Sequence, residues 1–198
     1  NYMSKYLLEM NLRYDGSSKF RPENRWDFFY GFSGGWRLSE EEFMKNVKFV
    51  NELKLRLSYG VVGNQSGISR YDGMQLYNFN SVNGAYIGDG RISYIKTSGE
   101  IATMGRSWER IHNYNLGLDF HLFDSRLQGT VELFMKKNNN MLIAVAYPGI
   151  LGDKAPASNS GKFEAKGYEG TVTWSDKIGK VNYHVGGTFT YADNKLVD

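Results

Sequence analysis

The sequence predicts an all-β fold in which about seven antiparallel strands form a segment of a transmembrane β-barrel. Three observations lead to this prediction: hydrophobic and polar residues alternate along several stretches, the stretches are long, and the connections between them differ in length. The composition agrees, because the 198 residues include 14 Tyr, 12 Phe and 23 Gly but only 3 Pro. Aromatic residues favour strands over helices.

Each predicted strand rests on a period of two residues. In the first, Met10 and Leu12 alternate with Asn11 and Arg13, so one face of the strand is apolar and the other polar. The same alternation predicts strands over residues 6–15, 26–38, 53–61, 113–122, 127–136, 168–174 and 181–191. Most of these stretches approach or exceed the ~9 to 11 residues with which a tilted strand crosses a bilayer.

Two further features distinguish a membrane barrel from a soluble sheet. The polar positions carry charges, glycines and amides, which is typical of a wet barrel interior, and aromatic residues such as Tyr6, Tyr14, Trp26 and Trp36 lie near strand ends, as in interfacial girdles. A soluble β-sandwich would show the same alternation. The sandwich therefore remains the alternative fold.

The connections favour the barrel because short and long ones fall on opposite sides. Residues 123–126 and 175–179 are predicted as tight turns, and residues 16–24, 64–107 and 138–161 as long loops. Short periplasmic turns and long extracellular loops are the usual layout of outer-membrane barrels. The remaining link, residues 39–52, begins with a capping-box pattern at Ser39 that predicts a short helix.

Composition and spacing argue against several classes of function. The absence of Cys excludes disulfides, thiolate metal sites and a cysteine nucleophile, and the near balance of 24 basic and 21 acidic residues argues against a nucleic-acid partner. The three histidines, His112, His121 and His184, lack metal-ligand spacing. Asp119 and His121 share a polar strand face but lie toward the predicted periplasmic end. We therefore expect no enzymatic activity, metal or cofactor.

Ordered sequence signatures resemble those of the SusC/RagA-type TonB-dependent outer-membrane transporters. They are residues 13–20 (RYDGSSKF), 33–41 (SGGWRLSEE), 53–60 (LKLRLSYG), 63–65 (GNQ), 108–109 (WE), 115–119 (NLGLD), 123–127 (FDSRL) and 167–170 (GYEG). The signatures cover nearly the whole chain in order. Two stretches, residues 30–32 and 136–140, match the family pattern loosely.

The resemblance implies that residues 1–198 are part of a single TonB-dependent receptor β-barrel domain of about 22 strands. Seven strands would place the two chain ends on opposite sides of the membrane, so we expect a barrel segment without the plug domain and the barrel C-terminus. The resemblance further implies an outer-membrane location in a Bacteroidetes-like Gram-negative bacterium and import of oligosaccharides or peptides. The implied partners are a SusD-type lid lipoprotein, and TonB through the absent N-terminal part.

The long loop is where we expect contacts with substrate or lid. Aromatic faces cover sugar C–H surfaces, while amides and carboxylates pair with hydroxyl groups. The candidate residues are Tyr71, Gln75, Tyr77, Phe79, Asn83, Tyr86, Asp89, Arg91 and Tyr94. The same composition suits ordinary loop packing. The alternative function is that of a soluble β-rich surface or carbohydrate-binding protein.

Overall fold

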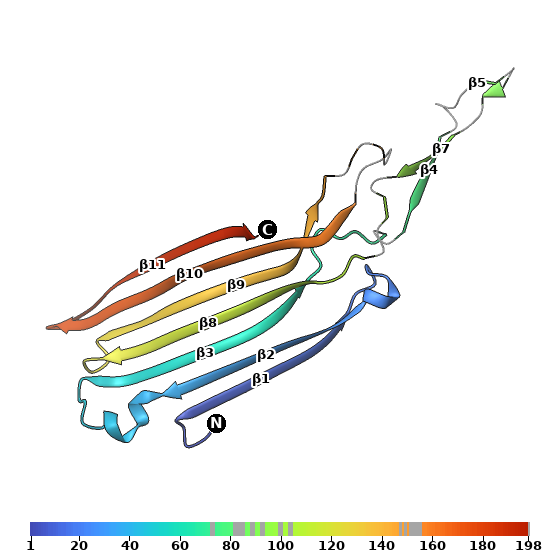
Figure 1. Cartoon of the computed structure of the whole chain (residues 1–198). Coiled ribbons are helices and arrows are strands. Elements are labelled where there is room, and N and C mark those ends of the chain that lie inside the picture. The colour runs from blue at the N-terminus through green and yellow to red at the C-terminus, as the bar shows by residue number, and fades with distance from the viewer. Residues whose placement is uncertain are drawn as a thin grey trace.

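The computed structural model is dominated by one antiparallel sheet whose strands follow the order of the chain (Figure 1). The structure describes residues 1–71, 74–80, 86–87, 90–91, 94–98, 101–102, 105–146, 148, 150 and 156–197. Within these residues the main sheet has seven strands: β1 (Tyr6–Gly16), β2 (Trp26–Arg37), β3 (Val50–Asn64), β8 (Glu109–Leu122), β9 (Leu127–Ala144), β10 (Ala157–Ile178) and β11 (Val181–Val197). The predicted all-β class and the seven antiparallel strands are confirmed.

The strand register places apolar residues of all these strands on one face of the sheet. One row of directly paired residues crosses the whole sheet: Leu8, Gly34, Leu57, Leu116, Leu133, Tyr168 and Tyr191. The side chains of this row are exposed, up to 81% for Leu8. We call this face the outer face.

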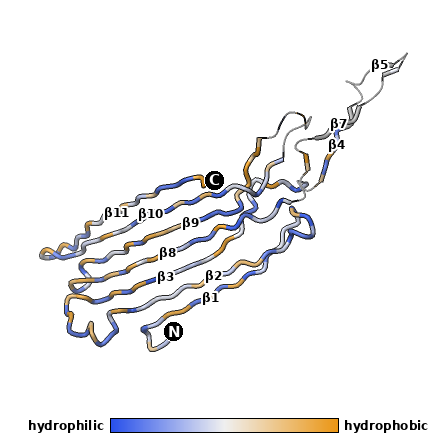
Figure 2. Tube along the Cα trace, viewed as in Figure 1, coloured by the Kyte–Doolittle hydropathy of each residue, from blue (hydrophilic) through white to orange (hydrophobic). Residues whose placement is uncertain are grey.

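Polar residues occupy the opposite face, which we call the inner face. The neighbouring row of paired residues, one position along each strand from the row of Leu8 and Tyr191, faces this side. It consists of Leu7, Gly35, Arg56, Gly117, Glu132, Glu169 and Thr190. Figure 2 shows the resulting alternation of hydrophobic and hydrophilic residues along the strands. The register therefore converts the period-two pattern of each strand into two chemically different surfaces.

Aromatic residues mark both edges of the apolar band on the outer face. One boundary runs from Tyr14 on β1 to Tyr191 on β11, and the other from Tyr6 to Tyr183. The residue pairing connects Tyr6 of β1 with Phe189 of β11, so the boundary that ends at Tyr183 shifts by six residues over the six steps from β1 to β11. With about 3.3 Å per residue and about 4.8 Å between strands, this stagger gives a strand tilt of about 35°. Transmembrane barrel strands have such a tilt.

The link between β2 and β3 differs from the predicted helix. It forms two single 3₁₀ turns, η2 (Leu38–Glu40) and η3 (Glu42–Met44), and no side chain caps either of them. The expected capping box at Ser39 is therefore wrong. A carboxylate instead links this segment to the strands: Glu41 accepts hydrogen bonds from Tyr6 Oη (2.7 Å), Trp36 Nε1 (3.0 Å) and Lys5 Nζ (3.1 Å).

These three donors lower the pKa of Glu41 to about 2, with the Tyr6 hydroxyl as the largest contribution. A carboxylate that accepts several hydrogen bonds is stabilised in its charged form. Glu41 therefore holds the N-terminal strand against the link between β2 and β3 as an anion.

The two tight turns lie at the same end of the sheet as this link, which we call the turn end. Residues 123–126 join β8 to β9 as predicted, and Phe123, Asp124 and Ser125 adopt positive φ values of 56°, 56° and 60°. Backbone hydrogen bonds from Phe123 N to Phe49 O (2.8 Å) and from Ser175 N to Arg126 O (2.8 Å) attach the turn to its neighbours. The second turn is shorter than predicted, because β10 continues through Ile178 and only Gly179 (φ 63°) and Lys180 remain.

The opposite end, which we call the loop end, has longer strands than the sequence predicts. Half of the expected loop 138–161 is strand, because β9 extends to Ala144 and β10 begins at Ala157. Register shifts between Asn159 and Gly161 and between Gly161 and Phe163 interrupt the alternation there. A bulge adds one unpaired residue and breaks the period of two, which explains why the start of β10 is not predicted as strand.

Short strands extend beyond the loop end in the long connection from β3 to β8 (Figure 1). β4 (Leu76–Asn80) pairs with β7 (Tyr94–Ser98), and β5 (Tyr86–Ile87) pairs with β6 (Gly90–Arg91). The connection between β1 and β2 contains a 3₁₀ turn, η1 (Pro22–Asn24). Among the described residues, no helix is long and apolar enough to cross a membrane.

Candidate functional site

Charged residues of three strands form a network on the inner face. The Arg56 guanidinium on β3 donates to Asp119 on β8 at 2.7 and 3.0 Å and to Glu132 on β9 at 2.5 Å. The hydroxyl of Thr130 also donates to Asp119 at 3.0 Å. Gly117 leaves room for this arrangement, since a Cβ there would lie 3.0 Å from Arg56 Nη2. The inner face therefore carries charges that compensate one another, as a water-filled interior permits.

Two hollows lie along this network. One of about 550 Å³ is bordered by Ser33, Gly35, Arg56, Asn115 and Gly117 among others. The other, of about 410 Å³, contains hydroxyl and amide groups of Gln128, Thr130, Thr171 and Thr173 beside Asp119 and His121. Such groups donate and accept hydrogen bonds without a fixed charge. The inner face can thus contact uncharged polar molecules.

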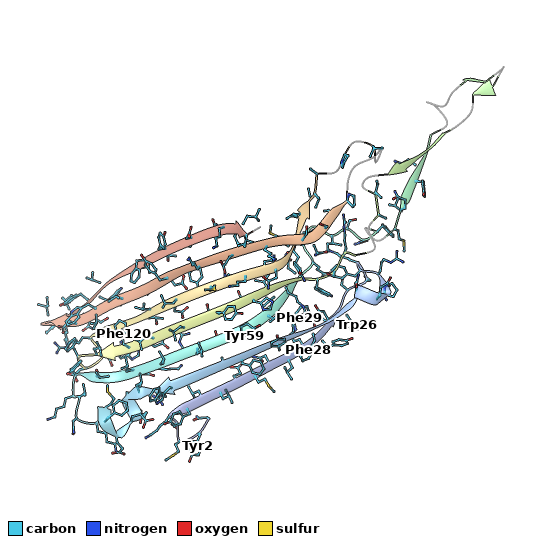
Figure 3. All side chains as sticks on the ribbon, viewed as in Figure 1. Tyr2, Trp26, Phe28, Phe29, Tyr59 and Phe120 are labelled. Carbon is cyan, nitrogen blue, oxygen red and sulfur yellow. The ribbon has the colours of Figure 1, made fainter. Side chains whose placement is uncertain are left out.

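A cluster of buried side chains occupies the loop end, where β2 and β3 separate. Their pairing stops at Gly31 and Gly60, although both strands continue further. Among the described residues, the buried hydrophobic side chains all belong to this cluster: Phe20, Phe29, Val61, Ile68 and Trp108. Figure 3 shows Phe29 toward the loop end of the sheet, away from Phe120 at the turn end.

The rings in this cluster touch one another closely. The Trp108 centroid lies 5.2 Å from that of Phe20 and 5.4 Å from that of Phe29. Gly63 faces Phe29, and a Cβ at this glycine would collide with the Phe29 ring. Packed side chains therefore occupy part of the gap between β2 and β3, beside a hollow of about 240 Å³.

Hydrogen bonds connect the loops through the same cluster, which together with these polar links we call the loop-end frame. Trp108 Nε1 donates to Arg25 O at 3.1 Å, and the hydroxyl of the buried Ser17 donates to Gln65 Oε1 at 2.5 Å. Arg110 of β8 also forms a two-bond ion pair with Asp27 of β2. These contacts link the β1–β2 loop to the long connection between β3 and β8.

A buried carboxylate extends the loop-end frame to β9. Glu109 is 6% exposed, and it accepts hydrogen bonds from Asn64 Nδ2 (2.8 Å), Leu142 N (2.7 Å) and Asn138 Nδ2 (3.2 Å). Asn159 of β10 bonds to both backbone groups of Ser107, at 3.0 and 3.1 Å. A buried charge needs such partners. Strands β3, β8, β9 and β10 are thereby fixed to one another where their loops begin.

The structure places three of the predicted contact residues at the base of the long connection. Tyr71 and Tyr77 are 58% and 64% exposed. Gln75 accepts a hydrogen bond from Ala102 N at 2.9 Å, so its amide joins the two ends of the β4–β7 hairpin. Gln75 therefore has a structural contact in addition to its expected role.

The structure gives less detail for the other six predicted contact residues. For Phe79, Tyr86, Arg91 and Tyr94 the structure describes the backbone only, and the register pairs Tyr86 with Arg91 and Asn80 with Tyr94. Asn83 and Asp89 lie outside the described residues. The contact role of these residues stays a prediction.

Groups considered for catalysis have other partners. Asp119 binds Arg56 and Thr130, while His121 Nδ1 lies 3.6 Å from Glu52 Oε2. In the described part of the chain, no three His, Cys, Asp or Glu side chains come together in a way that could hold a metal ion.

Comparisons with known proteins agree with this architecture. Residues 1–198 match the family described as "TonB dependent receptor-like, beta-barrel". A TonB-dependent receptor of Formosa agariphila is 32% identical over 100% of this chain and 18% of its own length. The TonB-dependent receptor SusC of Bacteroides thetaiotaomicron is 32% identical over 86% of this chain and 17% of its own length.

A solved structure is also similar. The RagAB peptide importer in its "open-open" state gives a TM-score of 0.86 at 26% identity, and the match covers 100% of this chain and 21% of that chain. The chain thus spans about a fifth of the length of the proteins that it matches. The two-faced antiparallel sheet and the match over the full chain lead to one conclusion: the chain belongs to the TonB-dependent receptor-like β-barrel family.

Proposed function

We propose that the chain forms part of the wall of an outer-membrane transporter that imports oligosaccharides or peptides with energy supplied through TonB. The outer row from Leu8 to Tyr191 carries this proposal, because its exposed side chains need a lipid environment. The soluble alternative would leave that row in water. The similarity to a receptor named SusC and to a peptide importer supports both substrate classes.

The partner is a SusD-type surface lipoprotein that covers the loop end. The long connection supports this part of the proposal, because Tyr71, Met74 and Tyr77 are 58%, 66% and 64% exposed at its base. Exposed apolar side chains of this kind are suited to a protein interface. The loop-end frame holds the base of this connection in place while the hairpin reaches outward.

Deletion of residues 71–94 from the full-length transporter tests the proposal. We expect normal barrel assembly, because the deleted segment lies outside the main sheet, but loss of substrate uptake or of lipoprotein association. Uptake of labelled oligosaccharides and peptides by cells, and co-purification of the lipoprotein, are the measurements.

A finer comparison uses single aromatic groups. Combined Tyr71→Ala and Tyr77→Ala should lower uptake or association, whereas Phe43→Ala, which removes a side chain 64% exposed at the turn end, should change neither. Normal uptake and association in the deletion variant, at normal surface expression, would show that the loop is passive.

A further inference from the structure

Lysines gather on the outer face of β9, β10 and β11, on the loop-end side of the aromatic boundary. The set, which we call the lysine patch, comprises Lys137, Lys162, Lys166 and Lys195 together with Glu164 and Asp193. The register places Lys166 one same-face row beyond Tyr168, Lys195 two rows and Lys162 three rows. With the strand tilt included, these rows lie about 5, 11 and 16 Å beyond the boundary.

The charges of the lysine patch do not cancel. Glu164 lies 2.8 Å from Lys137 Nζ and 3.5 Å from Lys195 Nζ, so one carboxylate serves two ammonium groups. Lys162 and Lys166 are exposed, and within the described residues neither has an ion-pair partner within 4.0 Å. Four lysines against one Glu and one Asp leave a surplus of positive charge.

This surplus is confined to one sector of the outer surface. Beyond the same boundary, the outer-face positions of β1, β2 and β3 are Gly16, Trp26 and Gly63, and none of them is a lysine. The inner face at the level of the patch presents Lys136, Ala165 and Asn194. The position of the patch therefore does not follow from a generally basic strand end.

The position of the lysine patch relative to the aromatic boundary indicates what kind of ligand it binds. Tyr168 and Tyr191 stack at 5.4 Å directly below the patch, where aromatic residues of a barrel lie at the membrane interface. Lysine stems lie along apolar surface while their ammonium groups reach the polar region. At this depth the negative groups of a bilayer are the phosphates of lipid headgroups.

We propose that the lysine patch binds the phosphate group of an anionic lipid in the outer leaflet. The inference rests on the membrane placement proposed above, and it is independent of what the transporter imports. Among the described residues Lys166 has no ion pair, and Lys195 shares Glu164 with Lys137 at the longer distance of 3.5 Å; both lie nearer to the boundary than Lys162, so they provide the main contacts.

Native mass spectrometry of the detergent-solubilised full-length transporter, titrated with lipid A, a phosphorylated glycolipid, tests this proposal. The double variant Lys166→Gln with Lys195→Gln should bind about thirtyfold more weakly, since each lysine near a charged headgroup contributes a factor of roughly five. The control Lys54→Gln with Lys136→Gln removes the same charge from the inner face and should bind normally.

Two further arms separate the sources of phosphate. Dephosphorylated lipid A should bind no better to the unmodified protein than to the Lys166→Gln, Lys195→Gln variant, and 10-fold excess inorganic phosphate should not displace the lipid. Equal losses in patch variant and control, equal binding of the dephosphorylated lipid, or displacement by inorganic phosphate would each overturn the proposal. Uptake assays on the same variants remain interpretable, because the patch lies outside the long loop and the inner face.

Discussion

The negative charge of Glu41 controls a contact between the start of the chain, at Lys5 and Tyr6, and the link between β2 and β3. Its pKa is lowered from the ordinary 4.5 to about 2 by the Tyr6 hydroxyl first, and then by Trp36 and Lys5. A lowered folded-state pKa contributes stability above the unfolded-state value, and this contribution is lost as the pH falls through the folded-state value. The window therefore runs from pH 4.5 down to about 2.

We expect Glu41→Gln to destabilise the full-length barrel at pH 7, and the difference from the unmodified protein to shrink between pH 4.5 and about 2. Urea unfolding at a series of pH values measures this. Glu40→Gln is the matched control, because Glu40 has only a 3.8 Å contact with Arg37. A Glu41→Gln effect that is as large at pH 2 as at pH 7 would contradict the assigned role.

Residue types alone could not predict the loop-end frame. Ser17 and Gln65, or Trp108 and Arg25, lie far apart in the sequence and follow no short-range period. Phe20, Trp108 and Glu109 contribute to the family signatures, yet nothing in their local pattern indicates burial. Such contacts depend on where β2 and β3 stop pairing, which is a property of the folded sheet.

At the scale of one strand, β8 offers a direct test of the two faces. Leu118 lies midway between Tyr114 and Leu122 on the outer face, so it is expected near the middle of the bilayer. Leu118→Arg should cost about 2 to 4 kcal/mol, the range for arginine at the midplane of a barrel. Asn115→Arg, on the inner face beside a hollow, should cost much less.

The measurement is the free energy of unfolding of each variant, made in the full-length barrel and folded into lipid vesicles. Asp119 is not a suitable control position, because it already binds Arg56. Similar costs for Leu118→Arg and Asn115→Arg would show that the outer face does not contact lipid.

Alternation predicted the strands well where the register is regular and poorly where it is not. The central parts of β1, β2, β3 and β8 agree with the expected ranges because each pairs residue by residue in the core of the band. The sequence does not predict the loop-side half of β10, because Lys162, Glu164 and Lys166 replace apolar residues on the outer face there, and bulges near Gly161 shift the register beyond them. The link after β2 is not the helix that its sequence predicts, because Ser39 and the acidic residues after it mimic a helix start.

For the whole molecule, the two outermost strands determine how the isolated segment behaves. Within the described sheet, β1 and β11 each have one neighbour, so each leaves a row of unpaired backbone groups. In hydrocarbon such groups cost several kcal/mol each, and in water they promote aggregation. Residues 1–198 expressed alone should therefore aggregate or remain unfolded.

Size-exclusion chromatography and thermal unfolding in detergent-free buffer check this expectation. The full-length protein in detergent is the control, since a closed barrel would give every strand two neighbours. A monodisperse monomer with a cooperative transition would contradict the membrane assignment and favour the soluble β-rich protein.

The stagger of one residue per strand also determines what a lipid chain meets along the barrel. A step of one residue exchanges the two faces of a strand, so at a given depth neighbouring strands alternate between outward and inward side chains. Outward side chains of neighbouring strands are therefore offset in depth and do not line up along the membrane normal. An acyl chain aligned with the membrane normal contacts side chains from two neighbouring strands in turn, and no single strand offers it a straight groove.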